Sequence, residues 1–268
     1  MQNRKKGRDD SVKYTYGQIR ESLPRKKNSN SSWWVKLWVR RISFFFTYLF
    51  INLGFSPNGV SVLSIFVSLA ACVLFCMKPL WALICAVVLI NFWLVLDCVD
   101  GNIARCRRRK TAFGEFVDDI GGYFTVAFVY LAIGVCAYRR GGVLLQEGCV
   151  WILLAGAVSS VCDVLARLIH KDYEHFASKL DDEETRRKKN SMESYEVGDK
   201  RSISYIRRRI GKELGISGAF MPLTILCAVF NAYDLMILFY LLFNGAALVL
   251  TTAYLIYKGD RYDREHSN

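Results

Sequence analysis

The sequence predicts an all-α, polytopic membrane protein with six transmembrane helices plus an N-terminal interfacial amphipathic helix. The 268 residues are 53% apolar, yet their formal net charge is +12. Four blocks hold 32 of the 36 lysines and arginines, and apolar residues fill the gaps between the blocks, which cover residues 1–41, 98–113, 171–213 and 258–268. The gaps are close to the roughly 20 residues of helix that cross a hydrocarbon core, so a water-soluble globular domain is excluded.

Six apolar segments have the length of a span. We expect helices at residues 59–77, 80–98, 117–138, 148–168, 214–230 and 233–257. The loops after the first, third and fifth spans carry only three basic residues, Lys78, Arg139 and Arg140. Because basic loops stay on the cytoplasmic side, both termini and the remaining loops are predicted to be cytoplasmic, in an inner or plasma membrane. No removable signal peptide is expected, since the polar N-terminus leads into no short apolar core with a cleavage site.

The membrane domain is predicted to cover residues 33–257. It lies between a polar, basic cytoplasmic tail at 1–32 and a second cytoplasmic tail at 258–268. Within it, residues 171–213 form a long cytoplasmic loop with 12 basic and 10 acidic residues, a composition typical of an exposed segment.

Residues 33–55 are apolar but too interrupted to span. Three basic residues fall inside the segment, so we expect an interfacial helix anchored by tryptophans. The basic residues are Lys36, Arg40 and Arg41, and the tryptophans are Trp33, Trp34 and Trp38.

Several other classes of site are disfavoured. Most of the nine cysteines fall in predicted spans and none forms a CxxC pair, so packing is expected and a disulfide framework is not. Three histidines leave almost no room for a multi-histidine zinc site. The basic blocks lie beside spans, which indicates anionic headgroups and not nucleic acid as their partner.

Five carboxylates gather at one predicted membrane edge, where the second span ends and the third begins: Asp97, Asp100, Glu115, Asp118 and Asp119. A charge in hydrocarbon costs about 2.5–3.5 kcal/mol, so carboxylates gathered at a membrane edge indicate a specific structural or functional role. Asp97 and Asp100 share a helical face, and an antiparallel hairpin brings Asp118 towards them. Carboxylates that converge in this way suit a hard divalent cation such as magnesium, manganese or calcium.

Neighbouring residues favour a phosphate ligand. Gly101 and Ala104 leave room for a ligand to approach, and Arg105 supplies a positive charge suited to phosphate. The hairpin is therefore a candidate pyrophosphate site. The alternative is that the acids only cap helices and pair with the basic residues at 105–110.

The sequence from Asp97, DCVDGNIARCRRRKTAFGEFVDDIGG, resembles the signature of the CDP-alcohol phosphatidyltransferase family, D-x2-D-G-x2-A-R-x8-G-x3-D-x3-D. Seven residues fall on signature positions: Asp97, Asp100, Gly101, Ala104, Arg105, Gly114 and Asp118. The stretch SPNGVS, from Ser56 to Ser61, resembles the short Pro-Asn sequence before the first span of this family. With six spans, the resemblance covers about residues 33–257.

The resemblance implies a metal-dependent transferase of the EC 2.7.8 type. It would move a substituted phosphate group from a CDP-alcohol to a hydroxyl or phosphate of a lipid, polyol or glycan precursor and release CMP, in phospholipid or surface-glycolipid biosynthesis. One or two Mg²⁺ or Mn²⁺ ions would be held by Asp97, Asp100 and Asp118. The implied CDP pocket consists of Gly101, Ala104, Arg105, Gly114, Pro57, Asn58 and Ser61. Membrane lipids and a second copy of the chain, in a homodimer, are the further implied partners.

One signature position departs from the family. The last aspartate, which in the family serves as the presumed base, is replaced by Gly122. Three interpretations stay open. Asp119 or Glu115 serves as the base, with Asp163 as a more remote choice; the acceptor is acidic enough to react without one; or the chain is a catalytically inactive nucleotide-binding membrane protein.

Other basic residues are candidates for an acceptor phosphate. Arg167 lies four residues after Asp163 in the fourth span, where it either holds a phosphate or is simply neutralised. Arg207 and Arg208, before the fifth span, either bind an acceptor phosphate or face lipid headgroups. A transporter is disfavoured because no inverted repeat or pair of broken apolar helices is evident.

Overall fold

The computed structural model describes residues 13–24, 29–108, 111–179 and 203–266. Within these ranges the chain is helical and contains no strand. Six helical segments are long and apolar enough to cross a membrane. They are α4 (Pro57–Phe75), α5 (Leu80–Cys106), α6 (Ala112–Arg140), α7 (Val150–Lys179), a broken helix that ends in α10 (Met221–Phe230), and α11 (Tyr233–His266). The predicted all-α fold with six spans is confirmed, and the chain is an integral multi-pass membrane protein.

The helices around the acidic hairpin are longer than predicted. The second span was expected to end at residue 98, but α5 continues to Cys106, and α6 begins at Ala112 instead of 117. The hydroxyl oxygen of Thr111 caps α6 by accepting the N–H of Gly114 at 3.0 Å. Hydropathy marks where a helix leaves the bilayer, not where its hydrogen bonding stops, so the acids lie within helical turns.

The fifth span is a broken helix. It consists of α9 (Ile203–Leu214), a π-helical turn η2 (Ile216–Phe220) and α10, with non-helical φ and ψ at Gly218. A Cβ at Gly218 would lie 2.1 Å from the carbonyl oxygen of Glu213, so only glycine fits this bend. Pro222, in the first turn of α10, also cannot continue a preceding helix.

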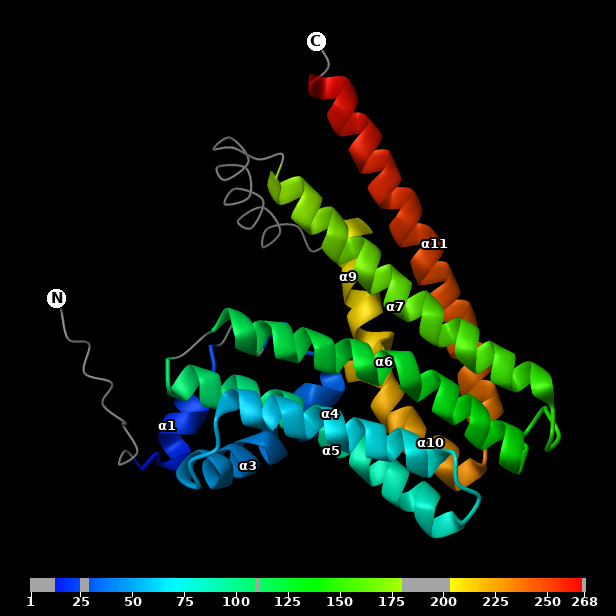
Figure 1. Ribbon diagram of the computed structural model, residues 1–268, viewed down its shortest axis with the longest axis horizontal. Helices are drawn as coiled ribbons and strands as arrows, with labels where there is room; N and C mark the ends of the chain where they lie inside the picture. The colour runs from blue at the N-terminus through cyan, green and yellow to red at the C-terminus, as the bar shows by residue number, and fades with distance from the viewer. Residues whose placement is uncertain (1–12, 25–28, 109–110, 180–202, 267–268) are drawn as a thin grey trace.

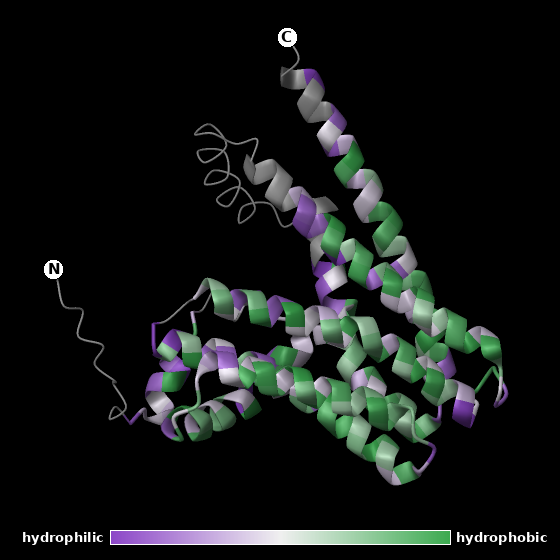
Figure 2. Ribbon diagram, in the orientation of Figure 1, coloured by the Kyte–Doolittle hydropathy of each residue, from purple (hydrophilic) through white to green (hydrophobic). Residues whose placement is uncertain are grey.

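The spanning helices pack as a bundle with two parts. Helix α4 packs on both α5 and α6, while α7 packs on α6 and α11. In Figure 1, α7 and α11 run side by side and extend away from the α4–α6 group, with α9 and α10 between the two parts. Figure 2 shows hydrophobic colour along the helices and hydrophilic colour at their ends and in the loops.

The N-terminal region is partly folded onto the bundle. Residues 13–24 of the predicted tail contain α1 (Tyr16–Glu21), in which Ile19 is fully buried. The backbone N–H of Tyr14 donates to Asn52 Oδ1 at 3.0 Å. The tail is therefore not wholly free of the membrane domain.

The predicted interfacial segment is helical from η1 (Val35–Val39) through α3 (Arg40–Asn52). Trp33 and Trp38 are 45% and 54% exposed, which agrees with anchoring in a membrane interface. Its place in the interface stays a prediction. The predicted 171–213 loop begins within α7 and ends in α9, and its central residues, 180–202, lie outside the described residues.

Candidate functional site

The Pro-Asn sequence starts α4 and brings the signature glycine against it. Ser56 is the N-cap, with its hydroxyl oxygen accepting the N–H of Gly59 at 3.0 Å, and Pro57 occupies the first turn. A Cβ placed on Gly114 would lie 2.8 Å from Asn58 Oδ1. Glycine at 114 therefore lets the start of α6 approach Asn58, and these two sequence signals meet at one site.

Asp100 links α5 to α4. Its side chain is only 6% exposed, and the hydroxyl of Ser61 donates to Asp100 Oδ2 at 2.6 Å. The hydroxyl hydrogen bond fixes the carboxylate in the interior, 39 residues along the chain from Ser61. Ser61, predicted from the stretch SPNGVS, thus directly contacts one of the signature acids.

Two of the predicted metal ligands act electrostatically on the third, Asp100. The charges of Asp97 and Asp118 both act on the buried Asp100 carboxyl. Asp97 and Asp118 are exposed. No three His, Cys, Asp or Glu side chains in the described part of the chain are arranged closely enough to hold a metal ion. Three carboxylates are the kind of oxygen ligand that a hard divalent cation prefers, and a metal site at these residues stays a prediction.

The signature glycine and arginine on α5 are adjacent. A Cβ on Gly101 would lie 3.3 Å from Arg105 Nη1, so the guanidinium group covers the glycine backbone. Arg105 also donates from Nη2 to Asn102 Oδ1. Ala104 lies one residue before it and is half-buried. These residues place a cation on the last turn of α5.

The candidate base Asp119 is engaged by another helix. Lys171, on α7, donates from Nζ to Asp119 Oδ2 at 2.5 Å and lies 5.7 Å from the ring centre of Tyr123. Glu115, the other candidate, is exposed in the first turn of α6. At Gly122, a Cβ would meet no atom within 4 Å. The space that the family's aspartate side chain would occupy is therefore open in this structure.

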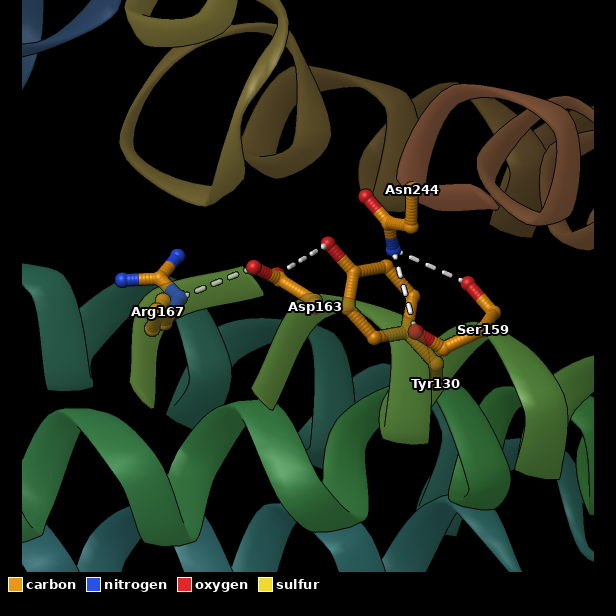
Figure 3. A network of polar contacts seen from close by, with 5 residues as sticks. All are labelled: Tyr130, Ser159, Asp163, Arg167 and Asn244. Carbon is orange, nitrogen blue, oxygen red and sulfur yellow. Dashed lines mark hydrogen bonds and ion pairs between the residues drawn. The ribbon is translucent and has the colours of Figure 1, made fainter. Parts of the chain in front are cut away.

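The intramembrane pair of α7 belongs to a polar network (Figure 3). Arg167 Nε donates to Asp163 Oδ1 at 2.8 Å, and the hydroxyl of Tyr130 donates to Asp163 Oδ2 at 3.3 Å. Nearby, Asn244 Nδ2 donates to the hydroxyl oxygen of Ser159 at 3.0 Å. Asp163 thus forms an ion pair with Arg167, whose two end nitrogens point away from it in Figure 3.

The last two predicted site residues lie in α9, and a cavity lies beside the signature residues of α5. Arg207 and Arg208 fall in α9, and their side chains lie outside the described residues. A cavity of about 350 Å³ opens beside the signature residues of α5 and is also lined by Arg40 and Lys212. Sequence reasoning singled out neither residue as a candidate, although Arg40 interrupts an apolar segment, which is unusual for a charged residue.

Comparison with known families agrees with this geometry. Residues 55–185 match the family model described as CDP-alcohol phosphatidyltransferase. A comparison with curated proteins found no match. The matched region holds both the Pro-Asn sequence and the whole signature, whose helices the structure packs together. Over residues 55–185 the chain therefore matches the model of a family whose general activity is CDP-alcohol phosphotransfer.

Proposed function

We propose that this protein transfers a substituted phosphate group from a CDP-alcohol to a lipid, polyol or glycan acceptor and releases CMP. The observation that carries the proposal is the convergence of Ser61 and Asn58 of α4 with Asp100 of α5 and Gly114 of α6. Spacing alone does not bring these helices together, and their contact supports one nucleotide site at the ends of α4, α5 and α6.

In this proposal, Asp97, Asp100 and Asp118 hold one or two Mg²⁺ or Mn²⁺ ions. Such ions neutralise pyrophosphate charge and stabilise the leaving group when bound. Ser61 holds the Asp100 carboxylate in place by its hydrogen bond at 2.6 Å. The Arg105 guanidinium, beside Gly101, offers its positive charge to the same phosphates.

The proposed transfer is a substitution at phosphorus. The acceptor oxygen forms a bond to the phosphorus that carries the alcohol, the bond from that phosphorus to the CMP oxygen breaks, and CMP leaves. An acceptor hydroxyl must lose its proton, whereas an acceptor phosphate need not. Among the candidate bases, Asp119 is the one nearest to Gly122 in the sequence. Its carboxylate, however, already accepts a hydrogen bond from Lys171.

Two features favour a second candidate function, an inactive nucleotide-binding protein. Gly122 replaces the family base, and Asp119 is paired with Lys171. Both functions predict CDP binding, and only the transferase predicts CMP. The acceptor phosphate roles of Arg167, Arg207 and Arg208, the cytoplasmic position of the site and a homodimer are further parts of the proposal.

The test measures CMP release by purified protein supplied with a panel of CDP-alcohols, a mixed lipid and polyol acceptor pool, and Mg²⁺ or Mn²⁺. Asp97→Asn and Asp118→Asn should reduce release below about one hundredth of the wild-type rate, because each removes charge that stabilises the transition state. Asp260→Asn, an exposed site in an ion pair with Arg264, is the matched control and should keep the rate. Unchanged release in either signature variant would overturn the metal assignment. CDP binding with no CMP from any donor would favour the inactive alternative.

A further inference from the structure

The cavity beside α5 has a wall made by the signature helix. Asp97, Gly101 and Arg105 are spaced four residues apart, so they form a stripe on one helical face, and all three line the cavity. Asp100 instead contacts Ser61 of α4. The cavity therefore adjoins the proposed metal and nucleotide site, with which it shares Asp97, Gly101 and Arg105.

The other walls come from outside the family-matched residues 55–185. One is the segment before and including the start of α3, with Ser31, Ser32 and Arg40, and the other runs from Lys212 to Ser217. The hydroxyl of Ser32 donates to the carbonyl oxygen of Ser217 at 2.5 Å. These walls are therefore joined across the chain, and they are features of this protein beyond the matched domain.

The charges lining the cavity are mainly positive. Arg40, Arg105 and Lys212 face a single lining carboxylate, that of Asp97. Arg40 is only 6% exposed, and its charge acts on that of Arg105, so two like charges lie near each other in a poorly hydrated place. Such an arrangement is costly without a compensating anion.

The hydrogen bonding of the two arginines is incomplete. Arg40 Nη2 donates to the hydroxyl oxygen of Ser31 at 2.7 Å, and Arg105 Nη2 donates to Asn102 Oδ1. The Nε atom of each is buried and has no hydrogen-bond partner among the described residues. A guanidinium group pairs well with a tetrahedral oxyanion, because its fork of donors matches two oxygens.

We propose that this cavity binds a phosphoryl anion between the guanidinium groups of Arg40 and Arg105 and the ammonium group of Lys212. The anion belongs either to the donor diphosphate or to an acidic acceptor, and that assignment to a substrate rests on the proposed function. Binding of the anion itself does not depend on the proposed function. The small hydroxyl groups of Ser31 and Ser217 leave the cavity open for such a ligand.

The experiment is calorimetric titration of the full-length, detergent-solubilised protein with inorganic phosphate. Arg40→Gln and Lys212→Gln should each weaken phosphate binding at least about tenfold, as expected for the loss of a charge-assisted contact. Arg41→Gln is the matched control, since Arg41 is exposed, neighbours Arg40 and does not line the cavity. If Arg40→Gln fails to fold, the Lys212→Gln variant tests the proposal, because Lys212 is exposed and its substitution does not disturb the interior. Equal affinity in all four proteins, or no phosphate binding by the wild type, would overturn the proposal.

Repeating the titration with saturating CDP distinguishes the two sources. Competition with phosphate would assign the anion to the donor, and phosphate binding beside CDP would assign it to the acceptor; each outcome supports the cavity as an anion site. CMP release without Arg40-dependent phosphate binding would remove only this inference. Arg40-dependent phosphate binding without CMP release would remove only the proposed function.

Discussion

Gly122 marks the residue where the site differs from the family signature. A Cβ there would meet no atom within 4 Å, so an added carboxylate has room. If the protein lacks a base, Gly122→Asp should raise the rate of CMP release from a hydroxyl acceptor about tenfold or more, since a general base contributes about 10²–10⁴. Steady-state kcat at saturating CDP-alcohol measures the effect.

The matched control is Gly122→Asn, which has nearly the same shape and cannot act as a carboxylate base. A higher rate in both variants would indicate a steric effect instead. A rate in Gly122→Asp no higher than in Gly122→Asn would contradict the missing-base hypothesis and leave Asp119, Glu115 or an acidic acceptor to account for turnover.

The residue types of the site follow from sequence, whereas their contacts do not. Spacing alone places Asp97 and Asp100 on one face, because a helix has a fixed period. The hydrogen bond from Ser61 to Asp100 joins α4 to α5, and no local rule predicts it. Arg40 lies still farther from the motif along the sequence, and its segment predicts only an interrupted apolar helix.

At the scale of helices, the start of α11 is fixed by a carboxylate that accepts several backbone N–H groups. Asp234 is 1% exposed and accepts the N–H groups of Val143, Leu144 and Leu145 at 3.1, 2.7 and 3.0 Å. A Cβ on Gly142 would lie 2.1 Å from Asp234 Oδ1, which explains glycine there. The loop between α6 and α7 is thereby fixed to the start of α11.

Asp234→Asn should lower the free energy of unfolding by about 2 kcal/mol, because a charged acceptor of three N–H groups becomes neutral and one of its oxygens becomes a donor. The midpoint of thermal unfolding in detergent should fall by about 5 °C. Glu147→Gln is the control. Its ion pair with Lys78 has side chains 57% and 65% exposed, so less than about 1 kcal/mol is expected. Equal shifts in the two variants would contradict this account.

The existence of every spanning helix follows from hydropathy, and the ends of the helices do not. Caps such as Thr111 act after the apolar run has ended, so α5 and α6 exceed the predicted spans. The bend at Gly218 likewise depends on the carbonyl of Glu213, which lies close only once α9 has folded. Local hydrogen bonding and close backbone contacts determine the helix ends and the bend, and hydropathy does not predict them.

At the scale of the whole molecule, the loops separate into two groups. Three loops meet at one end: Arg139 Nη1 donates to the carbonyl oxygen of Cys76 at 2.8 Å, Arg140 Nη2 donates to that of Pro79 at 2.8 Å, and Asp234 accepts from the loop after α6. Tyr14 and Cys106 lie close together at the other end, with the signature. The fold therefore agrees with an even number of crossings, and the charge bias favours the signature end as cytoplasmic.

This topology predicts protease access to inserted tags. A protease-cleavable tag after Gly148, whose φ is +86° and whose Cβ position is open, should be cut only in right-side-out vesicles. A tag after Asn268 should be cut only in inside-out vesicles, because 32 of the 36 basic residues lie in the four blocks assigned to that side. Immunoblotting of the fragments measures both. Cleavage of both tags from the same side would contradict six crossings, whereas exchange of the two sides would keep the fold and place the signature, with its CDP site, away from the cytoplasm.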